Sequence, residues 1–380
     1  MLSTNAVIMC TIAVLFILYG LITNRNRRVA LTISETSGKT YRISFIIILL
    51  FFCIVGALIT DTYDISSYRY AYDERLSHGK EPLFDSIQFF FHDIGWNFDS
   101  FKLLWIIIIA ILLYKGIKRI SNAPEEVVAL ALLSVLPSFI TQMRSAMVCA
   151  IVLNAFSLLE SGRRQDRILY AIIVILCAQL HIVGYVFLFY LFTKYNETQK
   201  TNLVYFVVLG IISILALGMN AFFGTIILTI SKIIPGLASY SSRIISSIEG
   251  IGTSFKTGAF LLCKQVFLYV LTERACKIQM TVNPAERKRY SVISRINTLT
   301  LAFIPICILN ASFTRVFNPF LLVQYAMILN VGNYKAGISD KLVWNQGLKS
   351  ALICLTVFVF AVSIHSNPDD FIRMMNSIKF

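Results

Sequence analysis

The sequence predicts an all-α fold: a polytopic helical integral membrane protein with about 10–12 transmembrane helices and short broken or re-entrant helices on its outer side. Its 380 residues are 57% apolar and 14% charged, whereas soluble domains carry roughly 45–50% apolar and about 25% charged residues. The apolar residues form continuous runs, which favour helices over the alternating pattern of a β-barrel. We expect residues 1–380 to form a single polytopic membrane domain, with outer loops at about 61–99 and 235–256.

The basic residues fall mainly between the apolar runs. A net charge of +14 would suggest nucleic acid as the partner of a soluble protein. Here the distribution is typical of the positive-inside rule and of contact with anionic headgroups, so we expect the lipid bilayer and no nucleic acid. Four basic segments are predicted to be cytoplasmic, at residues 25–42, 115–119, 163–167 and 274–289. The alternate gaps then lie outside, and they contain Asp64, Arg144 and Arg315.

The expected spans follow this alternation, because each apolar run is bounded by a basic gap on one side and an outer gap on the other. In chain order they are Asn5–Ile22, Ile43–Thr60, Ser100–Tyr114, Glu125–Ile140, Ala146–Leu159, Asn202–Leu217, Gly258–Leu271, Val292–Leu309, Val316–Asn330 and Leu348–Ile364. The apolar segment Pro82–Ile94 is too short to span, since a span needs about 20 residues. We expect it to be an interfacial or re-entrant helix on the outer side.

The segment Ile168–Phe192 allows two interpretations. One long helix would place His181 within the membrane, whereas two short helices would place it at an outer turn. We favour two short helices, because broken helices at membrane depth are tolerated where they line a cavity. Arg144 is expected in a tight turn, Thr141–Ser145, between two spans.

Two arginines are predicted at the outer face, beside apolar runs. An arginine near the bilayer centre costs at least ~2.5–3.5 kcal/mol on insertion scales, so such residues usually face a cavity or a partner. Arg144 and Arg315 are therefore candidates for binding a phosphate group through the guanidinium fork. The alternative is an interfacial arginine that extends toward the headgroups, which is more common on the cytoplasmic side.

A histidine and an acidic, tyrosine-rich segment supply candidates for proton transfer. His181 lies among apolar residues, where it suits either a hydrogen-bonded core residue or a general base. Asp64 and Glu81 are the preferred carboxylate bases, and neighbouring aromatic residues are typical of sugar binding. The alternative for this segment is a solvated loop with interfacial tyrosines.

Motifs for cofactors and metals are missing from the sequence. It contains no GxxxxGK[ST] or GxGxxG, which argues against a nucleotide-driven pump or a dinucleotide enzyme. No HExxH or paired Cys/His set indicates zinc, and the eight cysteines form no CxxC pair. We expect neither a cofactor nor a metal.

The order of these features resembles a known family. An acidic segment with Asp64, Tyr68 and Tyr72 is followed by Glu81-Pro82-x-Phe84, then by the Arg144 turn, Ala178-x-x-His181 in a broken helix, and a late Arg315 with Phe317. This pattern, over roughly Ile43–Asn330, resembles the EpsG-like group of Wzy-type polymerases, which make O-antigen, capsular polysaccharide or exopolysaccharide.

The resemblance implies an enzyme at the outer face of the bacterial inner (cytoplasmic) membrane. Such polymerases transfer a growing glycan from undecaprenyl pyrophosphate onto a lipid-linked oligosaccharide repeat unit, and a chain-length regulator is an expected partner. The implied catalytic residues are Arg144 and Arg315 on the pyrophosphate, with His181, Asp64 or Glu81 assisting the acceptor. The implied substrate contacts are Tyr68, Tyr72, Phe84 and Phe317. The alternatives are a flippase or other transporter of lipid-linked oligosaccharides, a membrane acyltransferase acting on glycans, and an O-antigen ligase.

Overall fold

The computed structural model describes residues 37–60, 62–77, 79, 81–134, 136–192, 211, 229, 255–304, 307, 311–332 and 339–366. Every element in these residues is an α-helix or a 3₁₀ helix, which confirms the predicted all-α class. The predicted span Asn5–Ile22 lies outside the described residues, as do Asn202–Leu217 and the 235–256 loop almost entirely.

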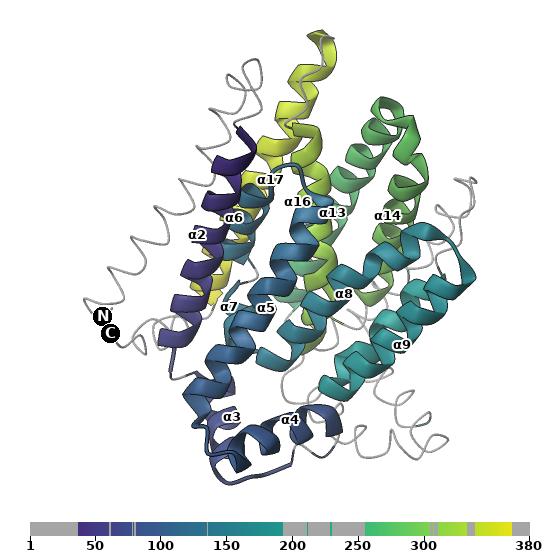
Figure 1. The fold of residues 1–380 in the computed structure, drawn as a ribbon. Helices are drawn as coiled ribbons and strands as arrows, with labels where there is room; N and C mark the ends of the chain where they lie inside the picture. Colours follow the sequence, from purple (N-terminus) through teal and green to yellow (C-terminus); the bar gives the residue numbers. More distant parts are fainter. Residues whose placement is uncertain are drawn as a thin grey trace. The chain divides into compact units, whose positions relative to one another are not determined.

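The helices shown in Figure 1 are, in chain order, α2 (Ser37–Leu58), α3 (Tyr63–Asp73), α4 (Pro82–Asp93), α5 (Phe98–Ile120), α6 (Pro124–Ser134), α7 (Leu136–Thr141), α8 (Met143–Ser161), α9 (Arg164–Leu180), η1 (Ile182–Phe192), α13 (Phe255–Val282), η2 (Pro284–Glu286), α14 (Arg287–Thr300), η3 (Leu301–Phe303), η4 (Ala311–Phe317), α16 (Asn318–Gly332) and α17 (Ser339–Ser366).

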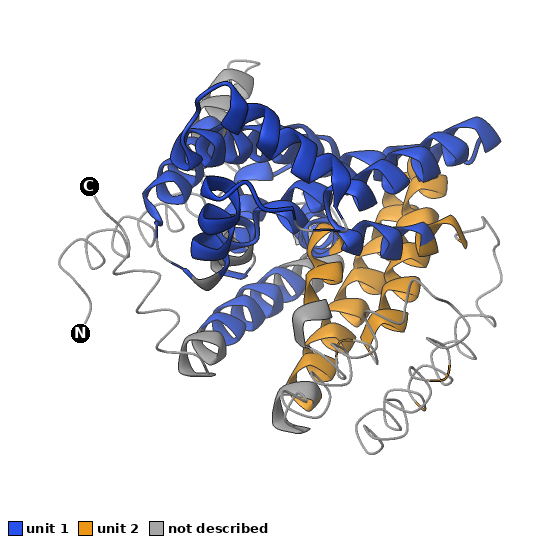
Figure 2. Cartoon of the chain, turned by 90° about the horizontal axis from the view of Figure 1, so that it is seen from below, with its two compact units in different colours: residues 1–188, 321–380 blue, residues 189–320 orange. Residues whose placement is uncertain are grey.

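The chain divides into two compact units, coloured separately in Figure 2. The first unit comprises residues 1–188 and 321–380, and the second comprises residues 189–320. In the first unit α2, α5, α8 and α9 pack side by side in that order, and the short helices α3 and α4 lie across one end of this row (Figure 1). Whether the whole chain forms one membrane domain stays a prediction.

Among the described residues, two helices of the first unit are long and apolar enough to cross a membrane, namely α5 and α8. The N-terminus of α5 is capped by Asn97, whose side-chain oxygen accepts a hydrogen bond of 2.8 Å from the Ser100 amide. Apolar side chains at helical spacing remain exposed on α9, including Ile168, Ile172 and Ile175, as expected of a surface that faces lipid. The number of spans in the chain stays a prediction.

The helices α5 and α8, which are neighbours in the row, approach each other closely. A Cβ atom on Gly116 would lie 2.8 Å from Leu153 Cδ2, so only glycine allows this separation. Beside it, the Asn154 side-chain amide donates across the interface to the Leu112 carbonyl at 2.9 Å. Small residues and interhelical hydrogen bonds are the usual basis of helix association in membranes, where burial of apolar surface contributes little.

Polar contacts join α16 to the end of α5 and the connection to α6, and join α17 to α6. The Asn330 side-chain amide donates to the Ile120 carbonyl at 2.9 Å and accepts from the Asn122 amide at 2.8 Å. On α17, Lys349 forms an ion pair with the buried Glu126. These contacts join segments about two hundred residues apart in the sequence, as the separations of 208, 210 and 223 residues show.

Several predicted boundaries were wrong. The polar stretch expected as an outer loop contains the helix α3, which begins after the Thr62 side chain accepts a hydrogen bond from the Ile65 amide. The described residues of the expected span Glu125–Ile140 are helical, in α6 and α7. Arg144 lies in the first turn of α8 and not in a turn over Thr141–Ser145, since the connection from α7 to α8 is Gln142 alone.

The segment Ile168–Phe192 breaks at His181. The α-helix α9 ends at Leu180, His181 has extended backbone angles of φ −159° and ψ 130°, and η1 begins at Ile182. This agrees with the two-helix interpretation in the position of the break and contradicts the single long helix.

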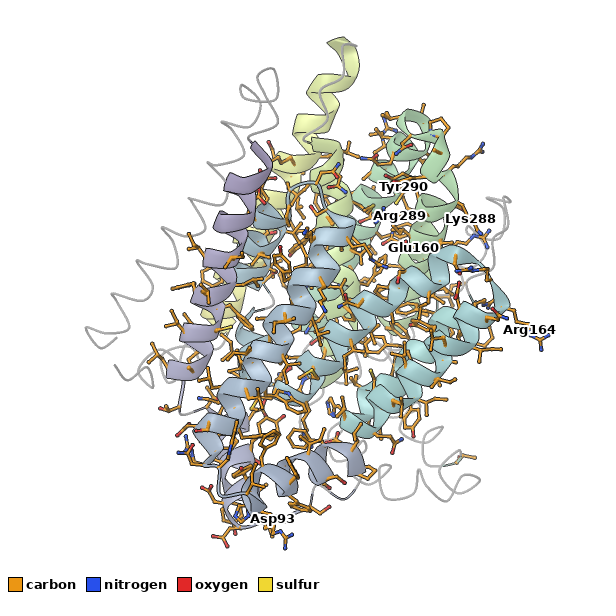
Figure 3. The ribbon with its side chains drawn as sticks, in the orientation of Figure 1. Asp93, Glu160, Arg164, Lys288, Arg289 and Tyr290 are labelled. Atoms are coloured by element: carbon orange, nitrogen blue, oxygen red, sulfur yellow. The ribbon has the colours of Figure 1, made fainter. Side chains whose placement is uncertain are left out.

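The second unit contains the hairpin of α13 and α14. The half-buried Glu273 carboxylate on α13 accepts hydrogen bonds from Ser294 at 2.7 Å and from Asn297 at 2.9 Å, both on α14. Arg274 and Lys277, which were expected in a basic loop, lie within α13. Basic residues continue into α14, where Figure 3 labels Lys288 and Arg289.

We predict that Gly116→Ala destabilises the first unit, whereas Gly347→Ala on α17 does not. The added methyl group at 116 must displace Leu153, and overpacking of this kind costs about 1–3 kcal/mol. A Cβ on Gly347 would meet nothing within 4 Å, so alanine there is neutral or stabilising by about 0.5–1 kcal/mol. The melting temperatures of the two purified variants measure the difference, and equal values would contradict the packing described.

Candidate active site

Glu81 joins three segments of the first unit through its carboxylate. It is the residue before Pro82, which begins α4, and it is only 4% exposed. One oxygen, Oε2, forms an ion pair with Arg144 Nη1 at the start of α8. The other oxygen, Oε1, is hydrogen-bonded to His181 Nδ1. A buried charge must be paired, and here a single carboxylate satisfies two partners with separate atoms.

Arg144 lies against two aromatic rings and is paired with Glu81. Its guanidinium carbon lies 4.9 Å from the centre of the Tyr68 ring and 5.5 Å from the centre of the Phe84 ring. Cation–π contacts of this kind stabilise a partly desolvated arginine. The Arg144 Nε atom is buried and has no hydrogen-bond partner among the described residues. The side chain is 17% exposed, so the guanidinium keeps some contact with the surroundings.

The start of α8 is fixed by a contact with α5. The indole nitrogen of the buried Trp105 donates a hydrogen bond of 3.0 Å to the Met143 carbonyl, one residue before Arg144. Trp105 also meets the Phe84 ring edge-on, with 5.4 Å between ring centres. The same aromatic group therefore supports both the backbone and the side chain of Arg144.

His181 is positioned by the tight connection between α9 and η1. The Gly184 amide donates to the His181 carbonyl at 2.8 Å, and the Ile182 amide donates to Glu81 Oε1 at 3.3 Å. A Cβ on Gly184 would lie 2.5 Å from the Ala178 nitrogen, so the backbone of η1 passes too close to α9 for any other residue. Glycine at 184 thus allows the turn that brings His181 to Glu81.

The short helices α3 and α4 are fastened by ion pairs. Arg69 on α3 binds Asp99 with two hydrogen bonds, of 2.7 Å and 3.1 Å, at the start of α5. Arg75, just after α3, pairs with Asp93 at the end of α4 at 2.8 Å. These contacts hold Tyr68 and Glu81 on elements that are anchored to the spanning helix α5.

The cluster lowers the pKa of Glu81. Burial alone would raise this pKa, but the hydrogen bond with His181 and the charges of His181 and Arg144 outweigh it, with a further contribution from the Ile182 amide. Glu81 is therefore a carboxylate at neutral pH. Because His181 Nδ1 is engaged by Glu81, Nε2 is the ring nitrogen that remains to contact a ligand.

The polar ends of the first unit are separated along α8 and α9. Figure 3 shows Glu160 and Arg164 where α8 ends and α9 begins, and Asp93 on α4 at the opposite end of the row. The basic group Arg163, Arg164 and Arg167 lies at the Glu160 end. The positive-inside rule is the basis for the expected outward orientation of the end that carries α4 and Glu81, which stays a prediction.

Five of the nine predicted site residues meet in this cluster: Glu81, Arg144, His181, Tyr68 and Phe84. Tyr68 and Phe84 are buried, and each lies against Arg144. Their expected contact with sugar is not tested, and the structure shows them supporting the arginine.

The remaining predicted residues lie elsewhere. Asp64 is in the first turn of α3, where a carboxylate favours the positive end of the helix. Tyr72 is 2% exposed, stacks on Phe101 with ring centres 5.2 Å apart, and donates to the Trp96 carbonyl at 3.0 Å. This burial disfavours contact between Tyr72 and a substrate. The catalytic role of Asp64 stays a prediction.

Arg315 and Phe317 belong to the second unit, where both lie in η4. Phe317 is 3% exposed and packs against Phe303, so its burial also disfavours contact with a substrate. Arg315 is partly exposed, and its position is described within the second unit alone. Its pairing with Arg144 on one pyrophosphate stays a prediction.

Sequence reasoning missed the residues that position the cluster, Gly184, Trp105 and the Ile182 amide. The only signal for the first was a glycine three residues after a histidine within an apolar run. No group of three His, Cys, Asp or Glu residues in the described part of the chain is arranged to hold a metal ion. The arrangement suits an anion at Arg144 and proton transfer at His181.

The spanning helices and the buried Glu81–Arg144–His181 cluster define a helical membrane protein with a charged site near one end. A comparison with models of protein families matches the EpsG family over residues 41–376. The chain therefore belongs to the EpsG family, which is associated with Wzy-like polymerases, and the predicted resemblance is confirmed. Membership indicates a glycosyltransferase-like polymerase in polysaccharide biosynthesis at the level of the family. Searches of curated proteins and of solved structures give no match.

We predict that Glu81 contributes to stability in a pH-dependent way. Because its pKa is lowered in the folded state, this stability is present above the ordinary value of 4.5 and is lost as the pH falls through the lower folded value. The melting temperature of Glu81→Gln should therefore be lower near neutral pH and fall less steeply on acidification. The matched control Glu74→Gln, at an exposed position in the same segment, should parallel the unmodified protein. Parallel curves for Glu81→Gln would contradict the lowered pKa.

Proposed function

We propose that the protein is a polysaccharide polymerase that transfers a growing glycan from undecaprenyl pyrophosphate onto a lipid-linked oligosaccharide repeat unit at the outer face of the bacterial inner membrane. The observation that carries this proposal is the shared Glu81 carboxylate between Arg144 and His181. It brings a cation suited to phosphate and a group suited to proton transfer within one cluster. Family membership supplies the class of reaction.

In this reaction the acceptor hydroxyl oxygen forms a bond to the anomeric carbon of the donor glycan. The bond between that carbon and the pyrophosphate oxygen breaks, and undecaprenyl pyrophosphate leaves with the electron pair. Arg144 stabilises the negative charge that develops on the departing pyrophosphate. His181 Nε2 takes the proton from the acceptor hydroxyl, and Glu81 orients the imidazole ring and stabilises its charged form. Arg315 is proposed as a second cation for the pyrophosphate.

The location of the site fits this chemistry. Glu81 lies at the end of the first unit opposite to the basic residues around Arg164, which favours an outward-facing site. A cluster of charges near one end also suits a polymerase better than a flippase, which needs polar groups along a central cavity at midplane depth. A chain-length regulator is a proposed partner on the grounds of the resemblance alone.

We predict that a deletion strain loses long glycan while single repeat units still reach the surface. Complementation with Arg144→Ala, Arg315→Ala or His181→Ala should not restore the long chains, because each removes a group assigned to the reaction. The measurement is the glycan ladder on a gel, with the amount of each variant in the membrane determined by immunoblot.

The matched control is Arg164→Ala, which removes an exposed arginine at the end of the row opposite to α4 and should restore the ladder. Wild-type chain lengths from the Arg144 and Arg315 variants would reject their assignment to the pyrophosphate. Loss of all surface repeats, with lipid-linked units retained inside the cell, would instead indicate a flippase. An unchanged ladder in the deletion strain would favour an acyltransferase.

We predict that Gly184→Ala shortens the glycan although residue 184 carries no reactive group. The added methyl group would meet the Ala178 backbone nitrogen at 2.5 Å, so η1 must move away from α9 and carry His181 and Ile182 away from Glu81. Gly347→Ala is the matched control, because a Cβ there meets nothing within 4 Å. A normal ladder from Gly184→Ala would show that the position of His181 does not limit polymerisation.

A further inference from the structure

The Glu81 carboxylate is divided between two tasks by its two oxygens. Oε2 binds only the guanidinium of Arg144 among the contacts described, whereas Oε1 binds His181 and accepts from the Ile182 amide. The contact with Arg144 can therefore break while the contacts with His181 and Ile182 remain. This division distinguishes Glu81 from a simple ion-pair partner.

Arg144 is fixed independently of Glu81. The rings of Tyr68 and Phe84 lie at 4.9 Å and 5.5 Å from its guanidinium carbon, and Trp105 anchors the preceding carbonyl. Loss of the contact with Oε2 would thus leave the guanidinium in place. Its buried Nε atom, which has no hydrogen-bond partner in the described part of the chain, is a second donor that a ligand could use.

A phosphate group and Glu81 compete for the same guanidinium. Phosphate binds arginine best through two parallel N–H groups, and Glu81 Oε2 occupies Nη1. Two anions bound to one partly buried cation repel each other. The repulsion is stronger there than in water, because charges interact more strongly in a medium of lower dielectric constant. A phosphate that binds Arg144 must therefore displace Oε2 or bind more weakly.

We propose that Glu81 is an internal competitor for the anionic group of the substrate, releasing Arg144 through Oε2 when a pyrophosphate binds while Oε1 stays on His181. The proposal deepens the proposed function and rests on it for the identity of the anion. As a consequence, anion binding at Arg144 is coupled to proton transfer at His181. Once Arg144 is neutralised by the pyrophosphate, the Glu81 carboxylate interacts more strongly with His181, which then becomes a better proton acceptor. The base is activated when the donor is bound.

The test is the binding of inorganic pyrophosphate to the purified full-length chain in detergent, measured by titration calorimetry. Glu81→Gln removes the competing charge and keeps the shape of the side chain, so we expect it to bind pyrophosphate about tenfold more tightly than the unmodified protein, a change of about 1.4 kcal/mol. The same Glu81→Gln variant should make no long glycan in cells, because the uncharged amide cannot stabilise protonated His181. Tighter binding together with lost activity is a combination that simple misfolding would not produce.

Glu74→Gln is the matched control, since it removes the same charge from an exposed position in the same segment and should bind within about twofold of the unmodified protein. If Glu81→Gln binds no more tightly than Glu74→Gln, the competition is overturned. If Glu81→Gln does not fold, Glu81→Met replaces it. Its side chain has a similar length and also removes the competing charge, so tighter pyrophosphate binding is again expected, and unchanged or weaker binding overturns the proposal.

Arg144→Gln separates this inference from the proposed function. It should abolish pyrophosphate binding. If Arg144→Gln abolishes binding and Glu81→Gln leaves it unchanged, only the competition fails and Arg144 keeps its assignment. If Arg144→Gln binds pyrophosphate like the unmodified protein, the assignment of Arg144 to the pyrophosphate fails, and the internal competition fails with it.

Discussion

The site depends on the pairing of one buried carboxylate. Glu81 is almost fully buried, and removal of a carboxylate from water is unfavourable unless charged and hydrogen-bonding partners replace the water. Those partners come from residues 63 and 100 positions away along the chain. The requirement to pair Glu81 thus fixes the ends of α4, α8 and α9 relative to one another, and the other features of the site serve to keep these ends in place.

Burial of apolar surface contributes little to helix association in a bilayer, so other contacts must hold the helices that support the site. Where α5 and α8 approach, a glycine and an interhelical hydrogen bond replace the large apolar side chains of a soluble core. At the end that carries Glu81, where Trp105, Phe84 and Phe101 meet, aromatic rings pack around the charged group. Rigid helices therefore carry the cluster, and the short helices α3 and α4 are secured to them by ion pairs.

The sequence was sufficient for the fold class and for the identity of the clustered side chains. Charge distribution and apolar runs predicted helices, and the cost of isolated polar residues among apolar runs singled out Arg144 and His181. The break at His181 was one of two open alternatives, since a run of this length contains no proline or polar segment to mark it. Helix boundaries were less predictable, because α3 forms in a polar stretch where hydrophobic periodicity gives no signal. The partition of Glu81 between two partners depends on side-chain geometry, which local sequence does not encode.

That partition explains why a catalytic site would hold its own cation neutralised. An arginine packed against aromatic rings and left without a counterion would be unstable in a partly desolvated position. Glu81 meets this requirement, and because it uses a different oxygen for His181, the same carboxylate stays available to the base after an anion takes Arg144. A separate counterion for each group would satisfy the charges equally well but would leave donor binding and proton transfer independent. In the proposed mechanism the shared carboxylate makes proton transfer depend on donor binding. This suits a reaction that needs its base only when a glycan donor is in place.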